Sequence, residues 1–131
     1  MANSLKNCFV PVKLALKIKN KNFNEECLAW YNYESLQFFG NDLNLDKYAN
    51  TETKPIAPLY EQCLTWLRVK YGYHILIDQE KLELKSGNFS ILYSFRIFLN
   101  GKIITKYPDI RKYDTYYNSL NNAISTTLDL I

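Results

Sequence analysis

Apolar and polar residues alternate most regularly in the second half of the chain. Every second residue of 89–99 is apolar or aromatic, and residues 73–78 follow the same period, so both segments are predicted strands. Asn100 and Gly101 come next, and both residue types tolerate the positive φ that a type I′ turn requires. The chain should therefore return as a strand over residues 102–107, and this strand should end at Pro108. The register predicted by a tight turn places Leu99 opposite Lys102, Ile97 opposite Ile104 and Arg96 opposite Thr105.

Helical periodicity marks two further segments. Pro58 begins the clearest helix, which runs to Tyr71, and Gly72 stands where a left-handed C-terminal cap is needed. Asp114 is predicted to cap the N-terminus of the final helix. The apolar face expected for that helix consists of Tyr117, Leu120, Ile124, Leu128 and Ile131.

The first half of the chain has weaker patterns. Residues 10–18 alternate as a strand does, yet Pro11 also suits the first turn of a helix and Leu14, Ala15 and Ile18 share a helical face, so both interpretations stand. Residues 27–33 and 35–39 are predicted to form a short aromatic hairpin. Residues 40–57 are a polar segment rich in turn formers, which predicts a loop.

The predicted order is α-β-β-α-β-β-β-α. It indicates an α+β fold, with an antiparallel sheet of about five strands and about three helices packed mainly on one face. A chain of 131 residues with no linker or internal repeat predicts one domain over residues 1–131. The residues expected to be buried are Leu64, Trp66, Leu67, Ile97, Leu120, Ile124 and Leu128.

Charge is distributed unevenly, although the net charge is only +3. Residues 1–24 carry five lysines and no acid, residues 25–66 have an acidic excess, and residues 67–131 are again basic. Lys13, Lys17 and Lys21 are four residues apart and therefore share a face in either a helix or a strand. We expect either ordinary solvated surfaces or a binding site for a partner of opposite charge.

Catalytic and metal-binding motifs are missing. The four glycines are isolated, which excludes phosphate-binding and nucleophile-elbow motifs. Cys8, Cys27 and Cys63 have no short spacing, so we expect reduced thiols and no metal or other cofactor. His74 with Asp78 and Tyr73 is the one arrangement in which a nuclease site could be imagined, but a second acid/base is lacking.

Three carboxylates in one short segment invite a metal interpretation. Asp78, Glu80 and Glu83 alternate with lysines, so a solvated loop of mixed charge is the expected structure. Trp66 lies on the apolar row of its helix and should pack in the core, whereas Trp30 is as easily a ligand-stacking residue as a core residue. We therefore expect a protein that is not an enzyme.

A cluster of basic and aromatic residues between 93 and 116 is the best candidate site. Cations attract phosphates, and tyrosine rings can stack on unpaired bases or dock against a protein. An ordinary surface, a protein interface and an RNA-binding surface all fit this composition. The cations are Arg96, Lys102, Lys106, Arg111 and Lys112, and the tyrosines interleaved with them are Tyr93, Tyr107, Tyr113 and Tyr116.

Three stretches of the chain carry a family resemblance. The first is 9–11 (FVP) and 14–19 (LALKIK) with Phe23, Glu26-Cys27 and Tyr31. The second is 57–62 (APLYEQ), 66–68 (WLR) and 70–72 (KYG) with His74-Ile75, and the third is 113–116 (YDTY) with Ala123-Ile124. Together they resemble a group of small proteins carried by Bacteroidota, their phages and other mobile elements. The resemblance implies a helical first segment, which in that group ends in Gly-Phe where this chain has Asn22-Phe23. It implies no active site.

Small size and this setting also resemble anti-CRISPR proteins, including inhibitors of the RNA-targeting type VI-B effector. The resemblance implies a non-enzymatic inhibitor that binds a host CRISPR nuclease, or its ribonucleoprotein, and blocks guide-RNA handling. The alternative is a small RNA- or DNA-binding accessory protein of a phage or mobile element. Without an apolar N-terminal segment or a run of about 18 apolar residues, we expect a cytoplasmic protein with no membrane partner. The expected partner-binding residues are Lys13, Lys17, Lys21, Arg96, Lys102, Lys106, Tyr107, Arg111, Lys112 and Tyr113.

Overall fold

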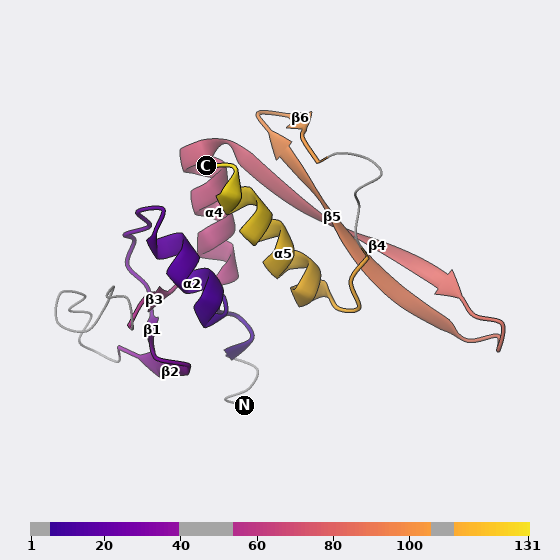
Figure 1. Cartoon of the computed structure of the whole chain (residues 1–131), viewed down its shortest axis with the longest axis horizontal. Helices are drawn as coiled ribbons and strands as arrows, with labels where there is room; N and C mark the ends of the chain where they lie inside the picture. Colours follow the sequence, from indigo (N-terminus) through magenta and orange to yellow (C-terminus); the bar gives the residue numbers. More distant parts are fainter. Residues whose placement is uncertain (1–5, 40–53, 106–111) are drawn as a thin grey trace. The chain divides into compact units, whose positions relative to one another are not determined.

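The computed structural model describes residues 6–39, 54–105 and 112–131 (Figure 1). The chain forms two compact units, Met1–Thr65 and Trp66–Ile131. Their boundary falls inside one continuous helix, α4 (Tyr60–Tyr71). The prediction of a single domain is not tested by this division and stays a prediction.

The first unit begins with a helix, which settles the ambiguity of residues 10–18. Helix α2 (Val12–Lys19) starts after Pro11, whose ψ of 159° is extended, as expected of a residue that precedes the first helical turn. Leu14, Ala15 and Ile18 are buried on one side of α2. The helical interpretation is therefore correct, because the face spaced by three and four residues is the one that the protein buries.

Asn22 adopts a left-handed backbone after α2. Its φ is 65°, a conformation that glycine adopts without strain and asparagine tolerates better than most residues. Phe23 follows with 1% of its surface exposed. Asn22 thus has the left-handed backbone of a glycine that ends a helix, and the residue after it, Phe23, is buried in the core.

A small antiparallel sheet completes the first unit. Strands β1 (Ala29–Asn32) and β2 (Ser35–Phe38) form the predicted hairpin, and β3 (Ile56–Ala57) pairs with the other edge of β1. Strand β3 lies in a segment predicted to be a loop. That prediction was wrong for these two residues because both are buried by tertiary packing that local polarity does not reveal.

The segment before α2 is held against the start of α4. Val10 N donates to Pro58 O at 3.0 Å, and Tyr60 N donates to Cys8 O at 2.9 Å. The buried Tyr31 hydroxyl donates to Val10 O at 2.7 Å, and burial raises the pKa of Tyr31.

Helix α4 begins at Tyr60, two residues later than predicted. The side chain of Gln62 accepts from Leu59 N at 3.0 Å, as in a capping box.

The second unit is organised by a long hairpin. Strands β4 (Tyr73–Glu83) and β5 (Phe89–Leu99) pair antiparallel over eleven residues each. The bounds of β5 are those predicted. Strand β4 extends five residues past its predicted end and takes in Glu80 and Glu83, which are exposed as predicted but belong to a strand and not to a loop. Strand β4 pairs with β5 along the whole length of both strands, and Gly87 (φ 86°) sits in the turn that joins the two.

The turn after β5 follows the prediction closely. Asn100 and Gly101 have φ of 48° and 88°, as a type I′ turn requires. Leu99 lies opposite Lys102, and Ile104 N donates to Ile97 O at 2.8 Å, so the predicted register is confirmed at these two positions. Strand β6 covers Lys102–Ile103, so the predicted strand is not formed at residues 104 and 105, while its residues 106 and 107 lie outside the described residues.

Helix α5 (Tyr116–Asp129) packs on β4 and β5. Its N-cap is Thr115, whose hydroxyl accepts from Asn118 N at 3.1 Å, and not the predicted Asp114, which lies one residue too early. Tyr117 was predicted to be on the buried face but is 43% exposed. The buried residues of α5 are Ser119, Leu120, Ala123, Ile124, Thr127 and Leu128.

The α+β class is therefore confirmed, and the arrangement of strands is not. The described residues contain three helices and two three-stranded antiparallel sheets, of order β2-β1-β3 and β4-β5-β6, in place of one sheet of about five strands. Trp66, Leu67, Ile97, Leu120, Ile124 and Leu128 are buried as predicted. Leu64 is only half-buried.

The three cysteines are not in disulfides, as predicted. Cys27 and Cys63 are buried, and Cys8 is exposed. Desolvation by burial raises the pKa of Cys27 and of Cys63 to about 12, with the charge of Glu25 adding to the shift at Cys27.

We predict that Leu67→Ala lowers the free energy of unfolding by about 2–5 kcal/mol, because the truncated side chain is fully buried and leaves a cavity. Trp66→Ala should have an effect of the same order. Val69→Ala is the matched control on the same helix, since Val69 is 79% exposed, and should change stability by no more than about 0.5 kcal/mol. Urea unfolding measures all three. Equal effects of Leu67→Ala and Val69→Ala would contradict the assigned face of α4.

We also predict that one thiol of three reacts quickly with a thiol reagent at pH 8 in the folded protein. The reactive species is the thiolate, and a pKa of about 12 leaves almost none of it at Cys27 and Cys63. Cys8→Ser should abolish the fast reaction, and urea should expose the two slow thiols. A fast reaction that survives Cys8→Ser would contradict the burial of the other two.

Candidate binding surface

The β4–β5 hairpin has two faces of different character. Odd-numbered residues of both strands point to one side, because paired residues such as Ile75 and Ile97 share a face of the sheet. Ile97 on this side is completely buried, and the Tyr73 hydroxyl donates to Leu130 O, at the end of α5, at 3.4 Å. We call this side the helix-side face. The even-numbered residues form the outer face.

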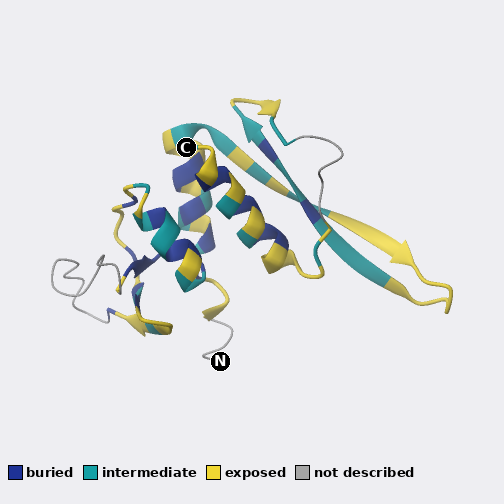
Figure 2. Cartoon of the chain, in the orientation of Figure 1, coloured by how far each residue is buried: buried dark blue, intermediate teal, exposed yellow. Residues whose placement is uncertain are grey.

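Exposure differs between the two faces and along the hairpin (Figure 2). The part of β4 nearest the 84–88 turn is exposed. On the outer face, Leu76 is 40% and Leu82 is 44% exposed, and Ile103 of β6, which pairs with Phe98, is 53% exposed. The outer face thus presents separate apolar side chains to solvent. The residues of the outer face are His74, Leu76, Asp78, Glu80, Leu82, Ser90, Leu92, Ser94, Arg96, Phe98 and Ile103.

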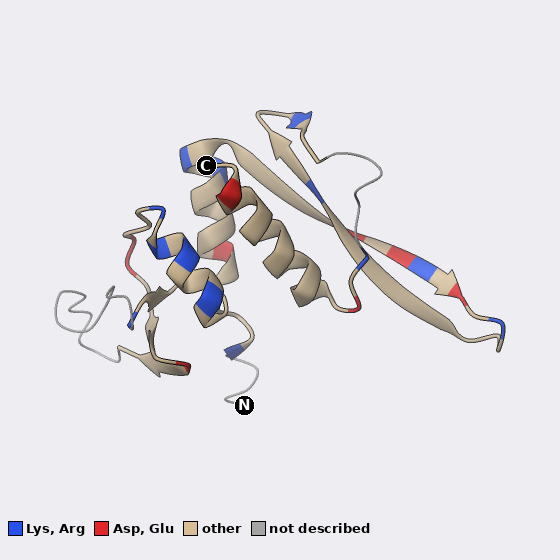
Figure 3. Cartoon of the chain, viewed as in Figure 1, with Lys and Arg blue, Asp and Glu red and all other residues tan. Residues whose placement is uncertain are grey.

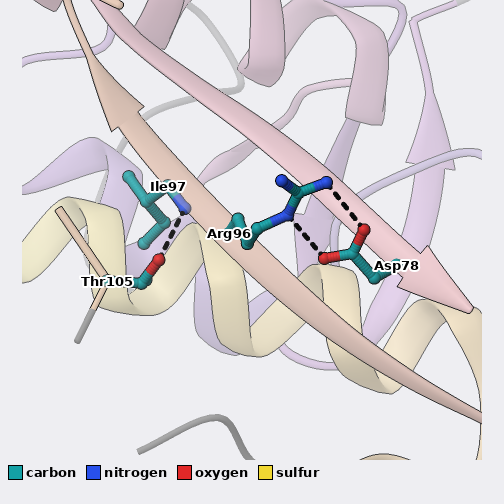
Figure 4. A network of polar contacts seen from close by, with 4 residues as sticks. All are labelled: Asp78, Arg96, Ile97 and Thr105. Atoms are coloured by element: carbon teal, nitrogen blue, oxygen red, sulfur yellow. Dashed lines mark hydrogen bonds and ion pairs between the residues drawn. The ribbon is translucent and has the colours of Figure 1, made fainter. Parts of the chain in front are cut away.

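An ion pair lies in the middle of the outer face (Figure 4). Arg96 Nε donates to Asp78 Oδ2 at 2.7 Å and Arg96 Nη2 donates to Asp78 Oδ1 at 2.9 Å, which is the bidentate geometry of a guanidinium on a carboxylate. The hydrogen bonds and charge of Asp78 raise the pKa of Arg96. The guanidinium also lies 5.7 Å from the ring centre of Phe98. Arg96 is therefore held in one orientation by a neighbour of opposite charge.

A second ion pair lies beside the first. Lys112 Nζ donates to Glu80 Oε2 at 2.6 Å, and both side chains are about half exposed. Lys112 precedes Tyr113, which bridges to Tyr93 of β5 through two backbone hydrogen bonds of 2.7 and 2.8 Å. Two cations predicted to oppose phosphate are thus paired with carboxylates of β4.

The described tyrosines of the predicted cluster, Tyr93, Tyr113 and Tyr116, lie on the opposite face from these cations. The Tyr113 ring stacks on Phe95 with centroids 6.1 Å apart, and Tyr93 contacts Tyr116 edge to face at 6.2 Å. Phe95 and Tyr93 both belong to the helix-side face. Successive side chains of an extended segment point to opposite faces, so a cation and the tyrosine next to it, such as Lys112 and Tyr113, lie on opposite sides. Among the described residues, Arg96 and Lys112 are therefore not combined with these tyrosines into one basic and aromatic surface.

The remaining predicted residues of the second unit are only partly described. Lys102 is exposed on β6. Lys106, Tyr107 and Arg111 lie outside the described residues.

The lysines of the first unit are placed by α2 (Figure 3). Lys13 and Lys17 are one helical turn apart, so they share a side of α2, and Lys13 is exposed. Lys21 lies beyond the end of the helix at Lys19, so the argument that it shares their face no longer applies. Figure 3 shows further lysine positions on and after the helix, which make this the most basic segment of the first unit.

The imagined nuclease arrangement is not assembled. His74 and Asp78 share the outer face, but Tyr73 belongs to the helix-side face and Asp78 is engaged by Arg96. Within residues 6–39, 54–105 and 112–131, no group of three His, Cys, Asp or Glu residues is placed to hold a metal ion. Trp30 is half-buried, with its ring centre 6.5 Å from that of Phe39 and 6.0 Å from Lys54 Nζ, while Trp66 is buried as predicted.

The sequence interpretation missed the ordered carboxylates of the outer face and its exposed apolar residues. The usable signal was the length of β5, because an eleven-residue strand places residues 79–83 in the opposing strand.

Comparison with protein-family models, with curated proteins and with solved structures finds no match for this chain. The family resemblance therefore stays a prediction. None of the described helices combines the length and apolar character that crossing a bilayer requires.

We predict that Arg96 and Asp78 are energetically coupled more strongly than Lys112 and Glu80. The first pair has two parallel hydrogen bonds and the second has one, on a longer and more exposed side chain. Two double-mutant cycles to alanine, read by urea unfolding, measure both couplings. The order should hold at low salt, and both couplings should weaken in high salt. Equal couplings would contradict the assigned geometry of the first pair.

Proposed function

We propose that this protein acts by binding another macromolecule and not by catalysis. The observation that carries the proposal is the composition of the outer face, where exposed apolar side chains surround fixed ion pairs. Exposed apolar side chains beside ordered charges can supply the apolar contacts and the charge complementarity on which a protein interface depends.

We further propose that the partner is a bacterial defence complex in the cytoplasm. The most concrete candidate is an RNA-targeting type VI-B CRISPR nuclease, with inhibition at the nuclease itself or at the loading of its guide RNA. This finer identification rests on the resemblance to small mobile-element proteins and to anti-CRISPR proteins. The ion pairs favour a protein surface over bare RNA as the first contact, because Arg96 and Lys112 already face carboxylates.

The partner-binding segment proposed first is the basic stretch that ends at Lys112. We predict that the triple variant Lys106→Glu, Arg111→Glu, Lys112→Glu stays folded, because an ion pair as exposed as Lys112–Glu80 contributes at most about 1 kcal/mol to stability. The same variant should lose co-purification with the effector and lose inhibition in cells, through unfavourable like-charge contacts. A panel of type VI-B effectors with and without guide RNA is the binding partner in the assay.

The matched control is the triple variant Lys13→Glu, Lys17→Glu, Lys21→Glu. It changes the net charge by the same amount on a different part of the chain. Lost binding in the first variant alone supports a binding surface in residues 66–131. Lost binding in the control alone moves it to the α2 segment. Wild-type protein that associates with no effector, in cells whose defence stays fully active, would overturn the proposed partner.

A further inference from the structure

The outer edge of β4 is an unprotected strand edge. The sheet order β4-β5-β6 leaves β4 with a neighbour on one side only. On β5, Ile97 O accepts from Ile104 N, and Tyr93 exchanges both backbone hydrogen bonds with Tyr113, so odd-numbered residues of β5 bond away from β4. Their partners, the odd-numbered residues of β4, therefore turn their N–H and C=O groups outward. In the part of the chain that the structure describes, no other strand bonds to these groups.

The length and composition of β4 make this edge suited to pairing. Proteins protect edge strands by making them short or by inserting proline, bulges or charges. Strand β4 has eleven residues and contains neither proline nor glycine. Its charged residues lie from Asp78 onward, so the half nearest α4 presents Ile75, Leu76 and Ile77 without a lysine or a carboxylate among them. A partner strand would therefore pair with this first half.

We propose that β4 pairs antiparallel with β4 of a second copy of this chain, about a two-fold axis at Leu76. A symmetric antiparallel pair places each residue opposite one at equal distance on the other side of the axis. Centred on Leu76, apolar residues oppose apolar residues and an imidazole opposes a carboxylate. The resulting pairs are Leu76 with Leu76, Ile75 with Ile77, His74 with Asp78 and Tyr73 with Gln79.

Registers centred further along the strand lack this complementarity. An axis one residue further along the strand would place Leu76 opposite Asp78, and an axis at Asp78 would place two aspartates face to face. In the proposed register, Ile75 and Ile77 both turn their backbone groups outward, so they form the hydrogen-bonded pair. The Asp78 oxygens retain acceptor capacity beside Arg96, so each can also receive a hydrogen bond from His74 of the second copy.

The geometry of this register allows a direct test by cysteine cross-linking. Leu76 would lie opposite itself at a non-hydrogen-bonded position, where Cα atoms are about 4.5 Å apart and a disulfide can form. In a Cys8→Ser background, Leu76→Cys should give a disulfide-linked dimer on mild oxidation. Leu82→Cys is the matched control, because Leu82 lies on the same face of the same strand with a similar exposed fraction, 44% against 40%. It should remain monomeric on a non-reducing gel.

Cross-linking that fails at Leu76, occurs at Leu82 alone, or is equal at both positions would overturn the proposed register. A second comparison tests the interface without cysteines. Leu76→Lys would place two cations in contact across the axis and should raise the dissociation constant of the dimer by at least about tenfold, whereas Leu82→Lys should not. Sedimentation velocity measures the equilibrium, and far-ultraviolet circular dichroism checks that strands are retained. Wild-type protein that sediments as a monomer throughout would overturn the dimer itself.

Discussion

The pairing of β4 with β5 is the constraint on which the second unit depends. Eleven consecutive residue pairs determine which side chains share a face, because side chains alternate strictly along each strand. A shift of one residue in β4 would move Ile75 from the side where Ile97 is buried to the exposed side. A one-residue shift in β5 would put the Arg96 guanidinium in the position where Ile97 is now buried, at a large desolvation cost. Apolar burial on one face and charge on the other therefore select the same register.

This alternation places neighbouring residues on opposite faces of the hairpin. Tyr113 packs on Phe95 while the preceding Lys112 reaches Glu80 on the outer face. Adjacent residues of an extended segment cannot both serve one surface, so a cluster defined by closeness in sequence divides into two. The outer face that remains is a mixture of apolar residues and charges, and Arg96 and Lys112 are paired there with carboxylates.

The elements whose signals are local could be predicted from the sequence. The Asn100-Gly101 turn specified its own geometry and the register on both sides of it, and Gly72 marked the end of α4, because both depend on backbone conformations that few residues adopt. The N-cap was misplaced by one residue because Asp114 and Thr115 are both good caps and only packing selects between them. The extension of β4 was missed because charged residues in an exposed strand have the composition of a loop.

The separation of the strands into two sheets could not be predicted in the same way. Pairing of β3 with β1 joins segments that are distant in sequence, and no period within either segment records the partner. The site residues were predicted individually as exposed cations. Their carboxylate partners, Asp78 and Glu80, belong to a segment that the sequence predicted to be a loop, so the two ion pairs could not be predicted from sequence patterns.

The hydrogen bond from Asn100 N to Gly72 O ties the turn after β5 to the end of α4. It closes the base of the hairpin at the point where the helix stops, while the short turn at Gly87 closes the other end. The contacts that build this sheet are therefore local along the chain, and little loop entropy is lost in forming them. The β1–β3 pairing has to close a longer segment first. Since folding rates fall as contacts become less local, we expect the β4–β5 hairpin to form before the β1–β3 pairing.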